Sequence, residues 1–238
     1  MPYLKRGGTK MSNQTLDATV FEYSVSYFNT TFENILTGIV VAYSCIIATK
    51  TEVPLNNENA IRDIFLSKEY LKGQKFKSKY PPLVNYHFDK ETVENGGRAD
   101  IRVLQVKPYK DDYAYYVIEC KRLDNINQNG ETGLNGEYIS NGIARFVSEK
   151  YPMYKNTSGM IGFVVSKMDI HKNVDCINHL LQNTFTQINT KKKLTKKQIT
   201  PNFEYSYYSN HKVGKSIKTI YHLMFDFLFP HINSRNPF

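Results

Sequence analysis

The residues from Gly96 to Lys121, GGRADIRVLQVKPYKDDYAYYVIECK, restrict the fold more than any other stretch of the sequence. Residues 98–106 alternate between apolar and polar side chains, which predicts a half-buried strand. Residues 113–121 are rich in aromatic and β-branched side chains, as expected for a strand in the middle of a sheet. Turn-forming residues separate the two runs. The stretch therefore predicts a β-hairpin, whose apolar face would hold Ala99, Ile101 and Val103.

The register of this hairpin decides which polar side chains meet. If Pro108–Asp111 form the turn and no bulge follows, Asp100 faces Glu119. Facing side chains in a sheet have Cβ atoms about 4.5 to 5.5 Å apart. Lys121 lies two residues beyond Glu119 and shares its face, whereas Cys120 points to the other face. The sequence thus predicts two carboxylates and one ammonium group side by side.

Two adjacent carboxylates repel each other unless a cation lies between them. Mg²⁺ prefers hard oxygen ligands, so Asp100 and Glu119 are candidate metal ligands. Lys121 would orient an attacking water or stabilise the charge that develops on a phosphate. The structural alternative is an ion-pair cluster that Lys121 and Arg98 neutralise. Side chains that are splayed apart, or capped by arginines, would favour this alternative.

An aspartate followed on the next strand by Glu-x-Lys resembles the motif of the PD-(D/E)XK nuclease superfamily. Here the motif is Asp100 and then Glu119-Cys120-Lys121. The order of elements, with a helix before the hairpin and a helix and a strand after it, extends the resemblance over most of the chain. Ala99 stands where the superfamily commonly has proline. The resemblance implies Mg²⁺ as the cofactor, with Mn²⁺ as a substitute, and adds the Cys120 carbonyl as a further metal ligand.

The resemblance also implies roles for two residues outside the hairpin. A glutamate on a helix before the hairpin often joins the metal site, and Glu58 is the best match; the alternative is an acid that only favours the N-terminus of its helix. The helix after Glu-x-Lys often contributes a basic residue near the scissile phosphate, which Arg145 matches. Arg145 would share a face with Tyr138 and Asn141, and its alternative is a surface ion pair. Glu91 and Glu94 are interpreted as solvated turn residues.

Composition limits the class of protein. The chain has 238 residues, 41% of them hydrophobic, which is enough for one large domain. Lys and Arg outnumber Asp and Glu, 31 against 22, and this balance favours a polyanionic partner, nucleic acid before a membrane. Three distant cysteines predict neither a disulfide framework nor a zinc site and favour a reducing compartment. The N-terminus lacks the apolar core of a secretory signal, and Ile35–Ala48 is short for a membrane span.

Hydrophobic spacing and turn residues place the other elements. We expect residues 1–28 to be an N-terminal arm or extension with a short edge strand at 20–28, and residues 29–238 to be one nuclease-like domain. The expected elements of this domain are a helix that starts at Thr30 and reaches 47, a helix that Asn56 or Asn57 caps and that reaches Leu71, a strand at 83–88, the hairpin, a polar loop at 123–137, a helix at 138–147, a strand at 159–166, a helix at 174–188 and a hairpin at 203–227. This order predicts an α/β fold with a central mixed β-sheet flanked by helices, a restriction-endonuclease-like core with an added C-terminal hairpin.

Five lysines in seven positions follow the last helix: Lys191, Lys192, Lys193, Lys196 and Lys197. As a group they are predicted to bind the phosphates of a nucleic acid, each contact adding sensitivity to salt. The alternative is a solvated helix end, which the helix dipole favours.

Together these features predict a metal-dependent nuclease that hydrolyses phosphodiester bonds. DNA is favoured over RNA as the substrate, in the cytoplasm and without a membrane, for restriction, phage defence or repair. The alternative is a catalytically inactive nucleic-acid-binding or assembly module of the same fold. The sequence leaves open the sequence specificity, a homodimer and a partner protein.

Overall fold

The computed structural model describes residues 18–94, 97–106 and 115–228 of the chain, with side chains from Thr30 onward and without the side chain of Glu94. The helices are α1 (Ala18–Ala48), α2 (Glu58–Phe65), α3 (Gln74–Lys79), α4 (Leu134–Tyr138), α5 (Ala144–Val147) and α6 (Ile170–Asn183). The strands are β1 (Tyr86–Glu94), β2 (Gly97–Gln105), β3 (Tyr115–Leu123), β4 (Thr157–Val164), β5 (Thr190–Lys196), β6 (Ser206–Val213) and β7 (Ser216–Asp226).

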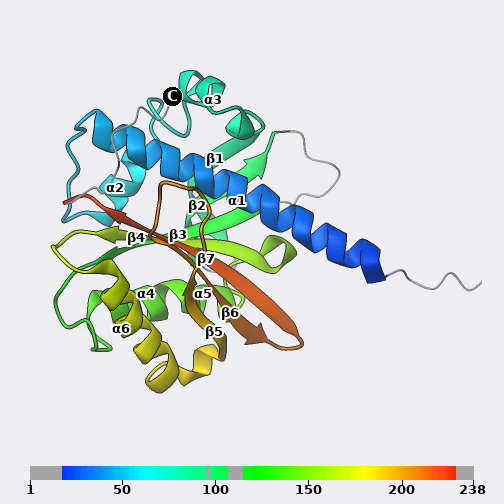
Figure 1. Ribbon diagram of the computed structural model, residues 1–238, viewed down its shortest axis with the longest axis vertical. Helices are drawn as coiled ribbons and strands as arrows, with labels where there is room; N and C mark the ends of the chain where they lie inside the picture. Colours follow the sequence, from blue (N-terminus) through cyan, green and yellow to red (C-terminus); the bar gives the residue numbers. More distant parts are fainter. Residues whose placement is uncertain (1–17, 95–96, 107–114, 229–238) are drawn as a thin grey trace, which may run out of the picture.

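A seven-stranded mixed sheet runs through the protein in the order β1-β2-β3-β4-β7-β6-β5. The pairs β3–β4 and β4–β7 are parallel, and the other pairs are antiparallel. Helices α1, α2 and α3 lie on one side of the sheet, and α4, α5 and α6 lie on the other (Figure 1). The predicted α/β fold with a central mixed sheet is therefore confirmed. The C-terminal hairpin is no addition at the edge, because β7 pairs with β4 in the middle of the sheet.

Each face of the sheet has its own apolar core. On one face, α1 buries a stripe of apolar side chains, in which Phe32 stacks on Tyr116 and Tyr43 stacks on Phe225, with ring centroids 4.6 and 4.5 Å apart. On the other face, α4 to α6 enclose a second core around Val117 and other residues of the sheet. All residues of β4 are buried, as expected for a strand that is covered on both sides. The sheet therefore holds the hairpin β2–β3 rigidly between two cores.

The helix α1 differs from the prediction at its start. The edge strand predicted at 20–28 is wrong, because these residues form the beginning of α1, and Thr30 lies inside the helix. The alternating apolar residues of this segment suggested a strand. A helix that has already formed gains one backbone hydrogen bond with each residue added, however, so α1 extends from Thr30 toward the N-terminus as far as Ala18. The stretch Thr30–Ala48 is long and apolar enough to cross a membrane by length and composition, although 50% of it is buried inside the protein. Core helices and signal sequences meet the same criterion.

Three further predictions fail at element boundaries. The helix expected to reach Leu71 ends at Phe65. The strand expected at 83–88 begins only at Tyr86, because Pro81–Leu83 form a turn of 3-10 helix. The helix expected to reach 188 ends at Asn183. Asn189 then adopts a left-handed conformation, with φ 52°, and turns the chain into β5. The lysine run is therefore an edge strand, and the interpretation as a helix end is wrong.

Candidate active site

The hairpin β2–β3 has the predicted register. Ile101 faces Ile118 and Leu104 faces Tyr115 in an antiparallel pair, while the predicted turn lies outside the described residues. The paired residues of β2 begin at Ile101. Asp100 then reaches β3 through its side chain, because its Oδ2 accepts a hydrogen bond from the Cys120 backbone N at 2.8 Å. The first motif residue is thus held directly beside Glu119 and Lys121.

The ladder between β1 and β2 is interrupted at Asp100, beside this contact. The pairing with β1 skips Glu91, which has a φ of 53°, in the left-handed region that non-glycine residues seldom adopt. Ala99 was predicted to share a face with Ile101. The two residues instead pack in opposite cores, Ala99 with α4 to α6 and Ile101 with α1. The strand therefore changes its facing at Asp100, which turns the carboxylate toward β3.

Lys121 lies at the centre of a cluster of carboxylates. Its Nζ is 3.0 Å from Glu58 Oε1, 3.1 Å from Glu119 Oε1 and 3.9 Å from Asp100 Oδ2. The same Nζ donates a hydrogen bond to the Cys120 carbonyl at 2.6 Å. The predicted metal ligands and Lys121 are therefore brought together rather than splayed apart.

Glu58 reaches the cluster from the first position of α2. Asn57 caps this helix, because its side chain accepts a hydrogen bond from Ala60 N at 3.0 Å. The carboxylate of Glu58 accepts from Lys121 through Oε1 and from Arg122 N, at 2.8 Å, through Oε2. The start of the helix and the end of β3 are thus joined by one side chain. Glu58 both begins a helix and belongs to the cluster.

Glu119 is the most deeply buried carboxylate of the cluster, with 0% of the residue exposed. Its Oε1 accepts hydrogen bonds from Lys121 and from Arg145 Nη1, the latter at 2.8 Å. Its Oε2 is buried and has no hydrogen-bond partner among the described residues. Burial and the charge of Asp100 raise the pKa of Glu119 to about 7, although Lys121 and Arg145 act to lower it. This carboxylate is therefore costly to ionise in the folded protein.

The pKa of Lys121 changes in a different way from that of Glu119. Burial lowers the pKa of Lys121, but the charges of Glu119, Asp100 and Glu58 outweigh burial and hold the pKa above its ordinary value. The asymmetry arises because three carboxylates share one ammonium group. Lys121 is attracted by three carboxylates at once, whereas Glu119 is also repelled by Asp100.

Arg145 reaches Glu119 from α5 on the other side of the site. Its Nη1 also donates to Tyr151 Oη at 2.5 Å, and Tyr151 in turn donates to the Arg98 carbonyl at 2.6 Å. The polar face predicted for Arg145 is wrong at Tyr138, which is fully buried. A π-helix at Ile139–Ile143 adds a residue to the turn between them and changes the phase of the helix.

A close contact between this helix and the sheet brings Arg145 to the site. Gly142 lies in the π-helix, and a Cβ atom there would be 2.4 Å from Met160 Cε and 3.7 Å from Lys121 Cγ. A larger residue would require the terminal methyl group of Met160 to move aside. Glycine at this position thus lets the helix pack closely against β4 beside Lys121.

Arg62 completes the cluster and was missed by the sequence analysis. Its side chain is only 2% exposed, and its Nη1 donates to Asp100 Oδ1 at 3.2 Å. Its Nη2 lies 2.9 Å from Asp63 Oδ1 and 3.2 Å from Glu91 Oε1. Its position in the sequence could have indicated this role, because Arg62 follows Glu58 by one helical turn and adjoins the buried stripe of α2. Glu91, expected to be a solvated residue, belongs to this ion-pair network.

The cationic side chains of the cluster already occupy carboxylate oxygens that a metal ion would need. Arg62 binds Asp100, Arg145 binds Glu119, and Lys121 lies among the carboxylates. Within the part of the chain that the structure describes, no group of three or more His, Cys, Asp or Glu residues is arranged to hold a metal ion. The donor chemistry nevertheless suits Mg²⁺, because the cluster supplies carboxylate oxygens and leaves Glu119 Oε2 without a partner. The contact of arginines with both motif carboxylates favours the ion-pair alternative.

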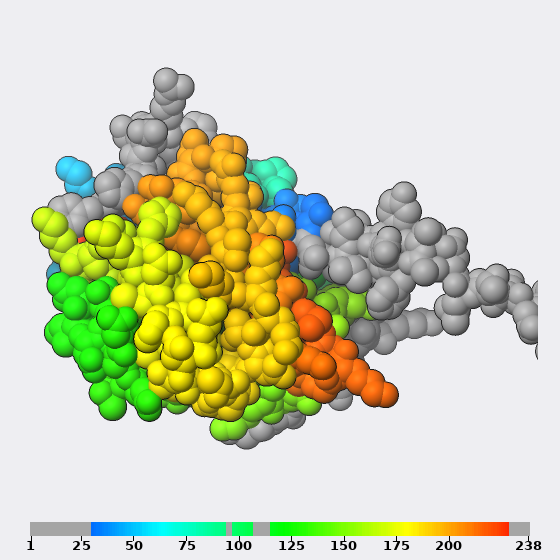
Figure 2. Space-filling view, turned by 60° about the horizontal axis from the view of Figure 1, so that its bottom comes forward, coloured from blue at the N-terminus to red at the C-terminus, as the bar shows by residue number. Residues whose placement is uncertain are grey.

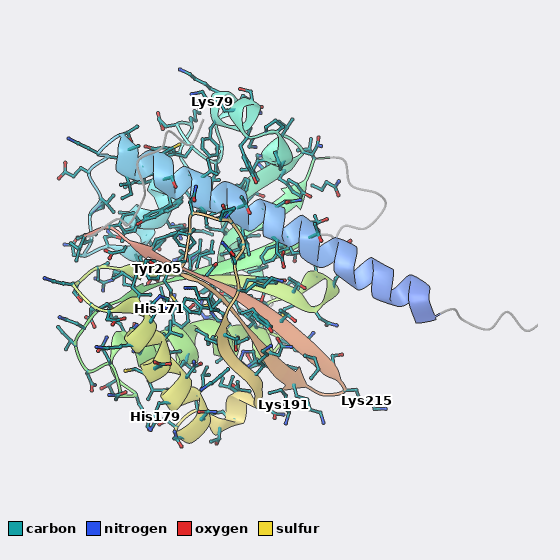
Figure 3. All side chains as sticks on the ribbon, in the orientation of Figure 1. Lys79, His171, His179, Lys191, Tyr205 and Lys215 are labelled. Carbon is teal, nitrogen blue, oxygen red and sulfur yellow. The ribbon has the colours of Figure 1, made fainter. Side chains whose placement is uncertain are left out.

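The five predicted phosphate-binding lysines lie away from this cluster. β5 is the edge of the sheet, four strands from β3, or about 19 Å at the usual strand spacing. Figure 2 shows β5 exposed at the surface beside α6, and Figure 3 shows Lys191 near Lys215 at one end of the hairpin β6–β7. Lys192 and Lys197 flank the Tyr208 ring, and Lys196 pairs with Glu204. Lysines and bulges also protect an edge strand from pairing with other chains, so this placement has a structural explanation as well.

A second buried polar network lies under β6 and β7. Tyr138 Oη is 2.8 Å from His222 Nδ1, and Ser209 Oγ is 2.8 Å from both His222 Nε2 and His211 Nε2. Burial lowers the pKa of His211 to about 4 and holds that of His222 well below its ordinary value. Both rings are therefore neutral parts of the core.

The residues predicted for catalysis and metal binding, Glu58, Asp100, Glu119, Cys120, Lys121 and Arg145, thus meet in one cluster between β2, β3, α2 and α5. The predicted phosphate-binding lysines lie elsewhere. Comparisons with protein-family models, with curated proteins and with solved structures found no match to this chain.

Proposed function

We propose that this chain is a metal-dependent nuclease of the PD-(D/E)XK type, with a restriction-endonuclease-like core. One observation carries the proposal: Asp100 and Glu119, chosen with Lys121 from their spacing alone, both lie within ion-pair distance of the Lys121 ammonium group, at 3.9 and 3.1 Å. A buried strand has no structural need for a carboxylate that is costly to ionise, because an apolar side chain would fill the same position without that cost. Perturbed carboxylates that cluster with a lysine are typical of functional sites.

The order of elements supports the same proposal. The hairpin β2–β3 carries the acidic residues, α5 supplies a basic side chain to the same cluster, and β4 pairs in parallel with the motif strand. The helix α2, which precedes the hairpin, contributes Glu58. These are the positions at which the resemblance placed the functional residues.

Mg²⁺ is the proposed cofactor, and Mn²⁺ is expected to substitute for it. Asp100, Glu119 and the Cys120 carbonyl would hold the ion, and Glu119 Oε2 would lose no hydrogen bond to the described residues on binding it. Lys121 and the arginines neutralise these carboxylates while no metal is bound. A bound metal lowers the pKa of a water molecule and neutralises charge on the phosphate.

The side chains of the cluster have distinct proposed roles. Lys121 is held in its charged form by the surrounding carboxylates, so it is suited to orient the attacking water and to stabilise negative charge. Arg145 is about one-third exposed, with 32% of its side chain accessible, and can turn toward a phosphate while it remains tethered to Tyr151. Glu58, whose side chain is 28% exposed, balances the charge of Lys121.

The proposed substrate is a nucleic acid, with DNA favoured over RNA, bound along the β5 edge as well as at the cluster. Reversing two exposed lysines, in Lys191→Glu combined with Lys193→Glu, should weaken binding to a duplex and reduce the slope of log affinity against log salt by about 2. The control is Lys68→Glu combined with Lys75→Glu, which changes the net charge equally at exposed positions outside β5. Equal effects of both pairs, measured by fluorescence anisotropy in EDTA, would show that only net charge matters.

The nuclease proposal is tested by incubating the protein with supercoiled plasmid, linear duplex and single-stranded RNA in Mg²⁺, Mn²⁺ or EDTA. Asp100→Asn and Lys121→Met should abolish cleavage in proteins that remain folded by circular dichroism. Asp89→Asn is the matched control, because Asp89 lies on β1 and pairs with Arg102, outside the cluster. Cleavage that persists in Asp100→Asn would exclude this cluster as its source.

The alternative is an inactive nucleic-acid-binding or assembly module in which the cluster is a structural ion-pair network. The contacts of Arg62 with Asp100 and of Arg145 with Glu119 favour it. Under this alternative, the chain binds nucleic acid through β5 without cutting it, and neutral replacements in the cluster change only stability. A homodimer, a partner protein and a cytoplasmic role in restriction, phage defence or repair belong to the proposal as further expectations.

A further inference from the structure

Arg62 is the most buried charged side chain that the proposed chemistry leaves unused. Only 1% of the residue is exposed, and it lies on α2 one turn after Glu58. A buried charge is costly unless it is paired and hydrogen-bonded. Arg62 meets this requirement with three carboxylates, because its guanidinium donates to Asp63, Glu91 and Asp100.

The two oxygens of Asp100 have different partners. Oδ1 accepts from Arg62 at 3.2 Å, whereas Oδ2 accepts from the Cys120 N–H at 2.8 Å and lies 3.9 Å from Lys121 Nζ. Hydrogen bonds at both oxygens hold a carboxylate against rotation about χ2. The contact with Arg62 therefore fixes the plane of the Asp100 carboxylate and keeps one of its two equivalent oxygens turned toward β3.

We infer that Arg62 is a positioning residue, which fixes the plane of the Asp100 carboxylate so that Oδ2 is presented to Cys120 and Lys121. The inference concerns the orientation of Asp100, and only its consequence for cleavage rests on the proposed function. Lys121 also supplies charge near this carboxylate, but its Nζ is 3.9 Å away and makes no hydrogen bond to it, so the directed hydrogen bond to Oδ1 comes from Arg62. Arg62 therefore determines the orientation of the Asp100 carboxylate.

The guanidinium is suited to this role by its shape. It is planar and presents several N–H groups in a fixed fork, whereas a lysine ammonium is a single point on a flexible stem. Asp63 and Glu91 hold the far side of the fork, and these two acids are themselves paired with Lys90 and Arg98. The contacts with Asp63 and Glu91 thus fix the orientation of the guanidinium group that binds Asp100.

The inference is tested through the hydrogen bond at the opposite oxygen. We would label the three cysteines with ¹⁵N and measure amide hydrogen exchange by NMR in metal-free protein. Arg62→Lys keeps the charge but loses the fork, so Asp100 should turn and the Cys120 amide should exchange about 10-fold faster or more. Cys45 in α1 and Cys176 in α6 are internal reporters of global stability and should be unchanged.

Asp63→Asn is the matched control, because an asparagine there can still accept from Arg62 and does not touch Asp100. Its Cys120 amide should exchange at the wild-type rate. Unchanged exchange of Cys120 in Arg62→Lys would overturn the inference. Equal acceleration at all three cysteines would overturn it as well, because Arg62 would then contribute only to overall stability.

The consequence for catalysis is measured separately. Arg62→Lys should lower kcat by about 10- to 100-fold, the usual effect of losing a partner behind a metal ligand, with KM for the nucleic acid unchanged. The exchange experiment needs neither metal nor substrate. A wild-type protein that cuts nothing, together with faster Cys120 exchange in Arg62→Lys, would therefore refute the nuclease and leave the positioning role established.

Discussion

Replacing Glu119 by glutamine should make the protein more stable at alkaline pH while it abolishes cleavage. Glutamine has the size of glutamic acid and imitates its protonated form. The wild-type carboxyl group is fully buried, and burial together with the charge of Asp100 raises its pKa from its ordinary value of 4.5 to about 7. Ionised Glu119 therefore destabilises the folded protein, even with Lys121 and Arg145 beside it.

The size of this effect follows from the change in pKa. Each unit corresponds to about 1.4 kcal/mol, so ionisation of Glu119 costs about 3 kcal/mol in the folded protein. Because the folded pKa is raised, the folded state holds its proton between pH 4.5 and 7, where the unfolded state has lost it. The stability of the wild type should thus fall as pH rises through this window. The gain of Glu119→Gln should be absent near pH 4 and complete above pH 8.

The assay is urea unfolding of both proteins at pH 5, 7 and 9, followed by circular dichroism. We expect the two free energies of unfolding to be closest at pH 5 and the variant to be more stable by about 3 kcal/mol at pH 9. A residue that lowers stability and is needed for activity is typical of a functional site. A wild-type protein more stable than the variant at pH 9 would refute this reasoning and favour a structural ion pair.

Three further outcomes are expected. Lys121→Met should lower the free energy of unfolding by about 3 to 5 kcal/mol, because three carboxylates lose their shared ammonium group; a loss below 1 kcal/mol in urea unfolding would contradict that role. Apparent Mg²⁺ affinity should rise with pH up to about 7, since the metal competes with the proton on Glu119; calorimetry that finds a flat profile would exclude Glu119 as a ligand. The buried His211 has its pKa lowered to about 4, so its contribution of about 3 kcal/mol is complete above pH 6.5 and is lost as pH falls toward 4. His211→Gln should flatten this acid dependence, and an unchanged slope would contradict it.

The hairpin could be predicted because its information is local. Alternation fixed the facing of β3 and turn chemistry fixed the register, so Asp100, Glu119 and Lys121 were identified correctly as neighbours. The change of facing at Asp100 could not be predicted, since it depends on the left-handed backbone of Glu91 in the adjacent strand. For the same reason, the alternation gave the wrong face for Ala99.

The charged partners of the site could be predicted only in part. Arg145 was placed by resemblance, but the π-helix at Ile139–Ile143, which changes the phase between Tyr138 and Arg145, has no signature in the spacing of apolar residues. Arg62 resembled an ordinary surface arginine in sequence. Its role becomes visible only when three carboxylates from α2, β1 and β2 converge on it.

Long-range topology was the least predictable feature of the fold. The lysine run could be a helix end or a strand, and only its pairing with β6 distinguishes the two. The position of β7 beside β4 is likewise set by tertiary packing rather than by its own sequence. A strand with apolar residues on both faces indicates burial but does not identify its neighbours.

The most direct test of the central claim is a Mn²⁺ titration of the wild type and of Asp100→Asn, followed by electron paramagnetic resonance without nucleic acid. If the cluster is a metal site, the wild type binds Mn²⁺ stoichiometrically and Asp100→Asn loses that binding while it remains folded. If the cluster is a structural ion-pair network, Arg62, Lys121 and Arg145 retain the carboxylates and neither protein binds Mn²⁺. The second result would contradict the account.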